Sequence, residues 1–515
     1  METKIGTISI SSLEGGWIND FAKGNASTPQ TKPNTYVQGI LNMNKPNYLG
    51  QISSTFGENP NTMSATELAM NAAVSKAGKG YFILRGGIIK EVDLTASWAP
   101  ASNNYTAPAG TTTDQYKDIW KHVSGDTNIP AYVGAESMFF TYQTASNAYC
   151  NYFPTATPAT RGSGGQFPFQ FTYTSVPHVG VKSVNNQSYV TDGNYLRAYD
   201  PLTNAWTSIN VGLGTTLVSV ADYGNYVAAV GGDGTNSWLF LWTGTAATVP
   251  NYKYEIRDTN VTAIVNEGGD LRVFTYGKNG TTKIKTFSGN GFSEEGDFET
   301  PTSLCSSPIH GQVDVWLNQI VWKGYQSISG VVTDGYIWTY GSVRKNEVLT
   351  GAHRVGKVTT TNTTTTDTVG CVKNLYTDNL YIGIKDTTST YKIYNVKADT
   401  SYASTATSNL KTALYPLPRN STIERIQFYF SDYTVPGTSA SGSSLTCSLY
   451  ADYNYTTDLL NFSIPINDTT GSSTIYYYPI VKSIPNLDTF YMNINFTFCT
   501  IKKIDITYSY MEGDI

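Results

Sequence analysis

The stretch YVTDGNYLRAYDPLTNAW, residues 189–206, has the pattern of two short β-strands joined by a tight turn and followed by a second turn. Residues 192–194, Asp-Gly-Asn, are of the types that adopt the positive φ angles of a short hairpin loop. Strand-forming residues, among them Tyr189, Tyr195 and Trp206, surround the turn. The stretch therefore predicts a β-hairpin that leads into a further strand.

The same pattern recurs along the chain, each time as a strand that begins with an aromatic or large aliphatic residue between two turns. The copies are residues 80–94, 221–232, 266–277, 315–324, 333–341 and 376–386. Their spacing, roughly 30 to 60 residues, brackets the length of a four-stranded propeller blade. Blades pack radially, and each one needs a neighbour to cover its apolar faces. We predict a β-propeller of about six or seven blades over residues 80–411, with an array of sandwiches as the alternative.

Strict alternation of apolar and polar residues marks the carboxy-terminal part of the chain. In LTCSLYA, for example, Leu445, Cys447 and Leu449 alternate with Thr446 and Ser448. The segments with this alternation are 425–430, 445–451, 490–498 and 504–510. Strands that are apolar on one face pack in two layers. We predict a β-sandwich over residues 412–515.

Residues 1–79 show neither pattern, and Gly, Pro and Asn interrupt their first part. The one helical pattern covers residues 64–78. Ser64 and Glu67 have the spacing of a capping box, Leu68 and Ala72 begin an apolar stripe, and Gly78 can end the helix. We predict an irregular docking segment with one helix, which becomes ordered on neighbouring subunits during assembly.

The composition narrows the class of protein. Only 14% of the 515 residues are charged, 38 are tyrosine, and the net charge is −5. The sequence has no basic cluster for nucleic acid, no apolar run of about 20 residues for a bilayer and no export signal. Such a polar, tyrosine-rich composition is typical of an exposed protein. A virion protein, made in the host cytoplasm and released by lysis, combines these features; a mature chain whose signal was removed is the alternative.

Residues with catalytic or metal-binding potential are sparse. The histidines His122, His178, His310 and His353 are far apart and have no carboxylate or cysteine at ligand spacing, which favours packing or surface roles. The five cysteines show no ligand spacing either, and we expect buried free thiols. The acidic run at residues 293–299 indicates a solvated loop, with a calcium site as the weaker alternative. We predict no enzyme activity, cofactor or metal.

Aromatic residues near the turns are the candidate ligand-binding residues. They are Trp238, Trp242, Tyr325 and Trp338. Flat rings of this kind stack on the apolar faces of sugars. The alternative, which we favour, is that the rings fill the wedges between blades.

Three parts of the sequence are similar to virion proteins of tailed bacteriophages or archaeal viruses, in the tail nozzle, hub and fibre-attachment group. They are GGWINDFAKGN with YVQGILNMN, then GYFILRGGIIKEVDL, and finally STIERIQFYFSDY with LTCSLYADYN and KKIDITYSYM. The resemblance extends over most of the chain, but it lies in the general character of the sequence and includes no diagnostic motif. It implies a structural or adhesive virion protein in multiple copies, whose partners are other tail proteins and copies of itself.

The leading hypothesis is therefore a structural component of the virus tail that acts in assembly and host attachment. The second hypothesis is an adhesin that binds a host receptor or surface glycan through the loop aromatics. The third is a propeller glycoside hydrolase with an unrecognised pair of carboxylates.

Overall fold

The computed structural model consists of strands joined by turns and bends, and none of its described residues is helical. Within the described part of the chain, no helix is long and apolar enough to cross a membrane. The structure describes residues 3–10, 16–17, 36–39, 52–53, 62–65, 67–85, 87–95, 103–106, 115–123, 136–144, 147–156, 169–182, 186–203, 205–243, 248–276, 281–301, 308–316, 319–328, 331–340, 353–359, 369–376, 379–385, 391–396, 408–412, 415–430, 444–450, 458–465, 477–480, 484–497 and 500–511.

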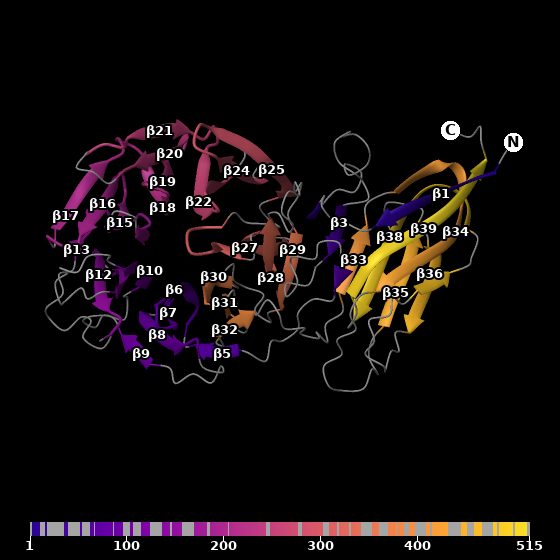
Figure 1. Ribbon diagram of the computed structural model, residues 1–515, viewed down its shortest axis with the longest axis horizontal. Helices are drawn as coiled ribbons and strands as arrows, with labels where there is room; N and C mark the ends of the chain where they lie inside the picture. Colours follow the sequence, from indigo (N-terminus) through magenta and orange to yellow (C-terminus); the bar gives the residue numbers. More distant parts are fainter. Residues whose placement is uncertain are drawn as a thin grey trace. The chain divides into compact units, whose positions relative to one another are not determined.

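Seven four-stranded sheets stand around a common centre, as in a seven-bladed β-propeller (Figure 1). This arrangement confirms the predicted all-β propeller. In order along each sheet, the strands are β6 (Ala69–Val74), β7 (Lys79–Leu84), β8 (Ile88–Asp93) and β9 (Asn103–Thr106); β10 (Gln115–Val123), β11 (Glu136–Gln143), β12 (Ala148–Pro154) and β13 (Phe169–Gln170); β14 (Gly180–Lys182), β15 (Ser188–Asp192), β16 (Tyr195–Asp200) and β17 (Ala205–Asn210); β18 (Thr216–Tyr223), β19 (Tyr226–Gly232), β20 (Ser237–Trp242) and β21 (Tyr252–Glu255); β22 (Asn260–Glu267), β23 (Asp270–Tyr276), β24 (Thr281–Phe287) and β25 (Phe292–Pro301); β26 (Val313–Trp316), β27 (Gln319–Ile328), β28 (Val331–Tyr340) and β29 (His353–Thr359); and β30 (Val369–Tyr376), β31 (Asn379–Lys385), β32 (Tyr391–Val396) and β5 (Thr62–Ala65).

The ring closes in two ways. The first strand of each sheet is innermost and contacts the first strand of the next sheet all the way round, including β30 with β6. In addition, β5 comes from before the first sheet and completes the last one, where Met63 pairs with Ile393. The last sheet is therefore built from both ends of the propeller segment, and this pairing holds the ring shut.

The hairpin of residues 189–206 forms as its sequence predicts. Strands β15 and β16 pair from Asp192 with Tyr195 to Ser188 with Tyr199, and Gly193 in the turn has a φ of 63°. The apolar side chains of this hairpin, with those of β18–β20, fill the space between two sheets, where Tyr189 is 0% exposed. Burial of each large apolar side chain contributes about 1.5–3 kcal/mol. The repeated hairpins thus supply the apolar side chains that pack between neighbouring blades and hold them together.

Three local predictions are wrong. The predicted helix over residues 64–78 is instead the end of β5 and all of β6. Strand β6 is buried on both faces, since Ala69 and Ala72 pack in one core cluster and Ala73 packs in another. The sheets therefore begin before residue 80. The predicted turn at residues 333–335 lies inside the unbroken strand β28. The acidic run at residues 293–299 lies in strand β25 and is not a loop.

The β-sandwich contains each of the four strands that the alternation predicts. Its strands are β1 (Thr3–Ile10), β2 (Gly16–Trp17), β3 (Tyr36–Gly39), β4 (Ile52–Ser53), β33 (Ser408–Thr412), β34 (Tyr415–Phe430), β35 (Ser444–Tyr450), β36 (Asp458–Pro465), β37 (Tyr477–Ile480), β38 (Ile484–Thr497) and β39 (Thr500–Met511). The long strand β38 pairs with β34 over residues 484–490 and with β35 over residues 491–497. Leu445, Cys447 and Leu449 on the predicted inward face are each 0% exposed.

Residues before the propeller belong to the sandwich. Strand β1 pairs with β39 from Thr3 with Met511 to Ile10 with Ile504. By its contacts the chain forms one unit of Met1–Pro60, Ile337–Lys357 and Lys397–Ile515, and a second of Asn61–Tyr336 and Val358–Val396. The prediction that residues 1–79 form a separate irregular segment is therefore wrong for the described strands. The propeller segment is inserted into the sandwich sequence.

Candidate functional site at the centre of the propeller

Several innermost strands carry one extra residue near the start, which bulges out of the pairing with the second strand. The bulged residues are Met70, Lys117, Val218 and Thr262. A bulge turns a side chain away from the direction that the alternation would give it. All four residues line one cavity of about 830 Å³. The repeated bulge is thus the local feature that builds the cavity.

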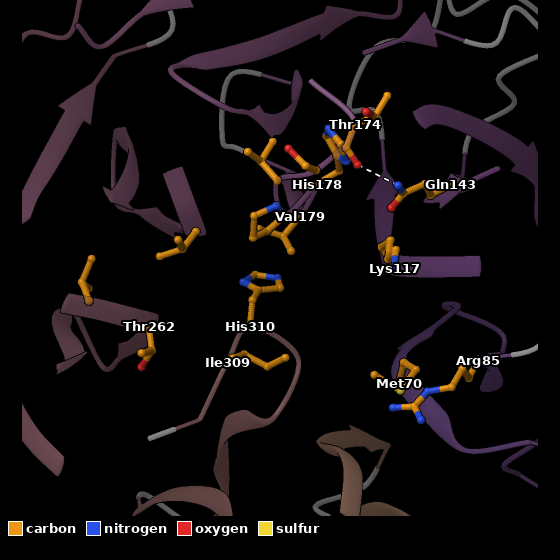
Figure 2. Close-up of a pocket in the computed structure, with 15 residues that line it drawn as sticks. Met70, Arg85, Lys117, Gln143, Thr174, His178, Val179, Thr262, Ile309 and His310 are labelled. Atoms are coloured by element: carbon orange, nitrogen blue, oxygen red, sulfur yellow. Dashed lines mark hydrogen bonds between the residues drawn. The ribbon is translucent and has the colours of Figure 1, made fainter. Parts of the chain in front are cut away.

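The lining of this cavity, which we call the upper cavity, is aliphatic and cationic. It consists of Met70, Arg85, Lys117, Gln143, Thr174, Ser175, Val176, Pro177, His178, Val179, Val218, Val261, Thr262, Ile309 and His310. Figure 2 shows Arg85, Lys117 and Gln143 on one flank, Thr262 on the other, and His310 between them. Among these lining residues there is no Asp, Glu, Phe, Tyr or Trp.

One wall of the upper cavity, the segment Thr172–His178, is fixed from behind. The buried Asp192 carboxylate accepts the backbone N–H groups of Thr172 and Tyr173 at 3.1 and 2.9 Å. Further along, Gln143 Nε2 donates to Thr174 O at 2.7 Å, a bond visible in Figure 2. Hydroxyl groups of neighbouring strands hold the carbonyls of Pro177 and His178. The wall is therefore formed before any ligand arrives.

Asp192 itself is an anchor for several groups. Arg197 donates to its Oδ2 through Nε at 2.9 Å and through Nη2 at 2.6 Å, and His178 Nε2 lies 3.6 Å from its Oδ1. Burial alone would raise the pKa of Asp192, but the neighbouring His178 imidazole and the bonds from Arg197 and the two backbone groups outweigh it and lower the pKa to about 2. Asp192 is therefore a carboxylate at any ordinary pH.

His310 forms the floor of the upper cavity. Its Nε2 lies 3.3 Å from Asp118 Oδ2, and its Nδ1 lies 2.9 Å from Ser219 Oγ. Ser219 Oγ also accepts the N–H of Ile264 at 3.1 Å. The hydroxyl thus links His310 to strand β22. A second cavity of about 350 Å³ lies beyond His310 and Gly311, which both line it.

The bonds around His310 join all seven sheets, and we call them the central brace. Its residues come from the innermost strands and from the turn before β26. Besides the bonds of His310, the brace comprises Asn71 Nδ2 to Asp118 Oδ1, Gly180 N to Asp118 Oδ2 at 2.7 Å, Ile264 N to Ser219 Oγ, and Val372 N to Gly311 O at 3.3 Å. Gly311, with a φ of 86°, lies so close to Asn71 that a Cβ would come within 3.1 Å of its side chain. The turn thus depends on glycine.

Ser219, His310 and Asp118 are in the order of a nucleophile, a base and an orienting acid. Ser219, however, is 0% exposed, and its oxygen already accepts a backbone N–H. A nucleophile must reach a substrate carbonyl. The arrangement therefore orients and anchors the imidazole, which is a structural role.

The predicted aromatic residues do not form one binding surface. Trp242 and Trp338 are 4% and 1% exposed, so neither offers a ring face to a sugar. Trp238 is half-buried, and Lys253 Nζ lies 4.2 Å from the centre of its ring. Tyr325 lies on β27, and its side chain is outside the described residues. Trp242 packs in the core cluster between two sheets, as the wedge-filling alternative predicts.

The histidines and cysteines follow the sequence prediction in part. His122 and His178 are each 1% exposed, and the side chain of His353 lies outside the described residues. The sequence reasoning missed the buried carboxylates beside His178 and His310. Cys150, Cys371 and Cys447 are buried free thiols, as predicted, and burial raises their pKa values. Among the described residues, no group of three or more His, Cys, Asp or Glu is placed to hold a metal ion.

Comparison with known proteins shows no family for this chain. No family model matches the sequence, and no curated protein matches it. Among solved structures, Chaetomium thermophilum Raptor is 11% identical with a TM-score of 0.46, over 66% of this chain but only 29% of that one. A chain of the Mitotic Checkpoint Complex is 10% identical (TM-score 0.42; 66% and 94% covered). The β-propeller domain of Myceliophteria thermophila Cps50 (Swd1) is 9% identical (TM-score 0.43; 65% and 100% covered).

Proposed function

We propose that the chain is a non-enzymatic structural component of a virus particle, in the tail nozzle, hub or fibre-attachment group, where it acts in assembly and host attachment. The observation that carries the proposal is the closed and braced propeller. Strand β5 seals the last sheet, and the central brace joins all seven sheets at the centre. A closed ring has few free strand edges and resists deformation. These are the properties that a load-bearing part needs.

The insertion of the propeller into the sandwich supports the same function. The chain passes between the sandwich and propeller sequences at residues 60/61 and 396/397, at the two ends of the propeller segment. A unit that is joined at both ends is more restrained than one on a single flexible linker. The similarity of three sequence segments to tail proteins agrees with this role. The partners in the proposal are copies of the chain, other tail proteins and a host receptor or surface glycan.

The decisive experiment measures how the purified chain assembles. Light scattering gives the mass in solution, and negative-stain images of the same fraction give the shape. We expect a closed oligomer of defined copy number, because tail parts surround or cap an axis. A chain that stays monomeric at high concentration, and also fails to join virus particles in a co-purification from infected cells, would contradict the proposal.

A further inference from the structure

Four tyrosines with neighbouring rings lie where two adjacent sheets of the propeller, β18–β21 and β22–β25, pack together (Figure 1). They are Tyr223, Tyr226, Tyr252 and Tyr254, and we call them the tyrosine patch. The centre of the Tyr252 ring lies 5.9 Å from that of Tyr226 and 6.3 Å from that of Tyr254. The rings of Tyr254 and Tyr223 have their centres 4.7 and 6.1 Å from that of Phe287. The rings therefore form one connected aromatic group across the two sheets.

The tyrosine patch is fixed from below and open to solvent. Tyr223, Tyr226 and Tyr254 are half-buried against the apolar core between the two sheets. Tyr252, at the start of β21, is 48% exposed. The turn between Tyr223 and Tyr226 contains Gly224, at which an added Cβ would meet no atom within 4 Å. Rings that are held in place and reach solvent lose little conformational entropy when a ligand stacks on them.

Polar groups lie beside the rings. Burial, and then the charges of Asp270 and Tyr254, raises the pKa of Tyr223, so the Asp270 carboxylate lies near this phenol. The charge of Tyr252, and then a hydrogen bond with it, raises the pKa of Tyr226. Both phenols are therefore neutral at ordinary pH and can donate a hydrogen bond. The tyrosine patch thus combines flat apolar faces with hydroxyl groups and a carboxylate acceptor.

These features together fit a chain of neutral sugars. A sugar ring has an apolar face that packs on an aromatic ring, and hydroxyl groups that donate to a carboxylate. Several connected rings suit a chain of sugar units better than a single unit, because each further ring adds apolar area to bury. The Asp270 carboxylate would repel an acidic sugar chain. A proline-rich peptide also packs in aromatic grooves, but proline has no N–H to donate to this carboxylate.

We propose that the tyrosine patch binds a chain of neutral sugars, with sugar faces on the tyrosine rings and sugar hydroxyls donating to Asp270. Tyr252, the most exposed of the four tyrosines, is the centre of the contact. The inference rests on the host-attachment part of the proposed function, to which it assigns a set of residues and a class of ligand.

The test is isothermal titration calorimetry of the full chain with short sugar chains. The neutral probes are linear hexamers of glucose, mannose, galactose and xylose, and the comparison probes are hexagalacturonate and decaproline. We expect binding of at least one neutral hexamer and of neither comparison probe. Tyr252→Ala should weaken that binding roughly fivefold or more, because a stacked ring is lost. Tyr252→Phe keeps the ring and should leave binding within about twofold.

Tyr510→Ala is the matched control. Tyr510 lies on β39 of the sandwich, is half-buried, and has its ring centre 6.1 Å from that of a second tyrosine, Tyr508. The same loss of a ring at this position should leave sugar binding unchanged. Binding of no neutral hexamer, unchanged binding by Tyr252→Ala, or an equal loss with Tyr510→Ala would each overturn the proposal. Preference for decaproline or hexagalacturonate would overturn the assignment to neutral sugars.

Light scattering on the same preparations separates this inference from the proposed function. A chain that forms a closed oligomer but binds no neutral hexamer contradicts the sugar site alone. A chain that binds the hexamer through Tyr252, but stays monomeric and fails to join virus particles, contradicts the virus-particle function and supports the sugar site.

Discussion

At the scale of single residues, the buried histidine His122 couples the stability of the propeller to pH. Trp120 Nε1 donates to Ser188 Oγ at 3.1 Å, and Ser188 Oγ lies 2.8 Å from His122 Nδ1. Burial, and then the charge of Lys182, lowers the pKa of His122 from 6.5 to about 4. The imidazole is therefore neutral in the folded protein at pH 6, where its unfolded counterpart is already largely protonated.

The sign of the pH effect follows from this difference. The folded state binds the proton of His122 more weakly than the unfolded state, so stability is fully present above pH 6.5 and is lost as the pH falls towards 4. The loss is at most roughly 3 kcal/mol. His122→Asn keeps an acceptor for Ser188 but does not titrate, so the pH dependence of unfolding between pH 6.5 and 4 should become shallower.

Two measurements check the prediction for His122. Urea unfolding at a series of pH values compares the wild type with His122→Asn. Nuclear magnetic resonance of carbon-13-labelled histidine then follows the imidazole directly, which is practical because the chain has only four histidines. A signal, absent from His122→Asn, that titrates near pH 6.5 would show that burial does not depress this pKa.

At the scale of strands and sheets, local sequence predicted the hairpins well and the first blade poorly. The hairpin at residues 189–206 depends on the residue types of a short turn and of its flanks, which the sequence displays directly. At the start of the first blade, Leu68, Ala72 and Ala73 suggested a helix instead. The small side chain of Ala69 has another reason, because a Cβ at Gly383 of β31 would come within 2.9 Å of the Ala69 Cβ. Tertiary packing thus overrides local propensity.

Two truncations that differ only by residues 61–66 test how the strands close each unit. Removal of residues 1–60 takes away β1 to β4 but leaves β5. Strand β39 should then lose its protection from hydrogen exchange along the edge that β1 covers, while the propeller keeps its protection. Removal of residues 1–66 also deletes β5. The edge of β32, residues 391–396, should then exchange rapidly, and the protein should aggregate through it.

Hydrogen exchange measured by mass spectrometry on individual peptides distinguishes the loss of the β1–β39 pairing from the loss of the β5–β32 pairing. The shorter truncation serves as the control for the longer one, since both lack the same sandwich strands. If β32 stayed protected after removal of residues 1–66, the ring would close without β5, and the pairing of β5 with β32 would not be what holds it shut.

At the scale of the whole molecule, the central site could not be predicted from the sequence. Asp118, Ser219 and His310 are far apart in the chain, and none has a partner at motif spacing. The closed ring brings them together, since each innermost strand faces the same axis. The bulges at Met70, Lys117, Val218 and Thr262 add to the difficulty, because strands that are buried on both faces show no regular alternation that an extra residue could interrupt. The site is therefore a property of the ring and not of any one blade.

The central brace makes a last prediction about the ring as a unit. His310→Ala removes the imidazole that joins Asp118 to Ser219, and it enlarges the two cavities that His310 lines. The free energy of unfolding should fall by about 2–4 kcal/mol, because hydrogen bonds are lost and a cavity is left in place of the imidazole. Hydrogen exchange should quicken in β10 and β18 as well as in residues 308–316, because the brace connects these sheets.

Ile309→Ala, a neighbouring change at a half-exposed side chain outside the brace, should alter exchange only locally. If His310→Ala also raised hydrogen exchange only in residues 308–316, His310 would merely fill space at the centre of the propeller. The sheets would then be held together by the apolar side chains packed between them.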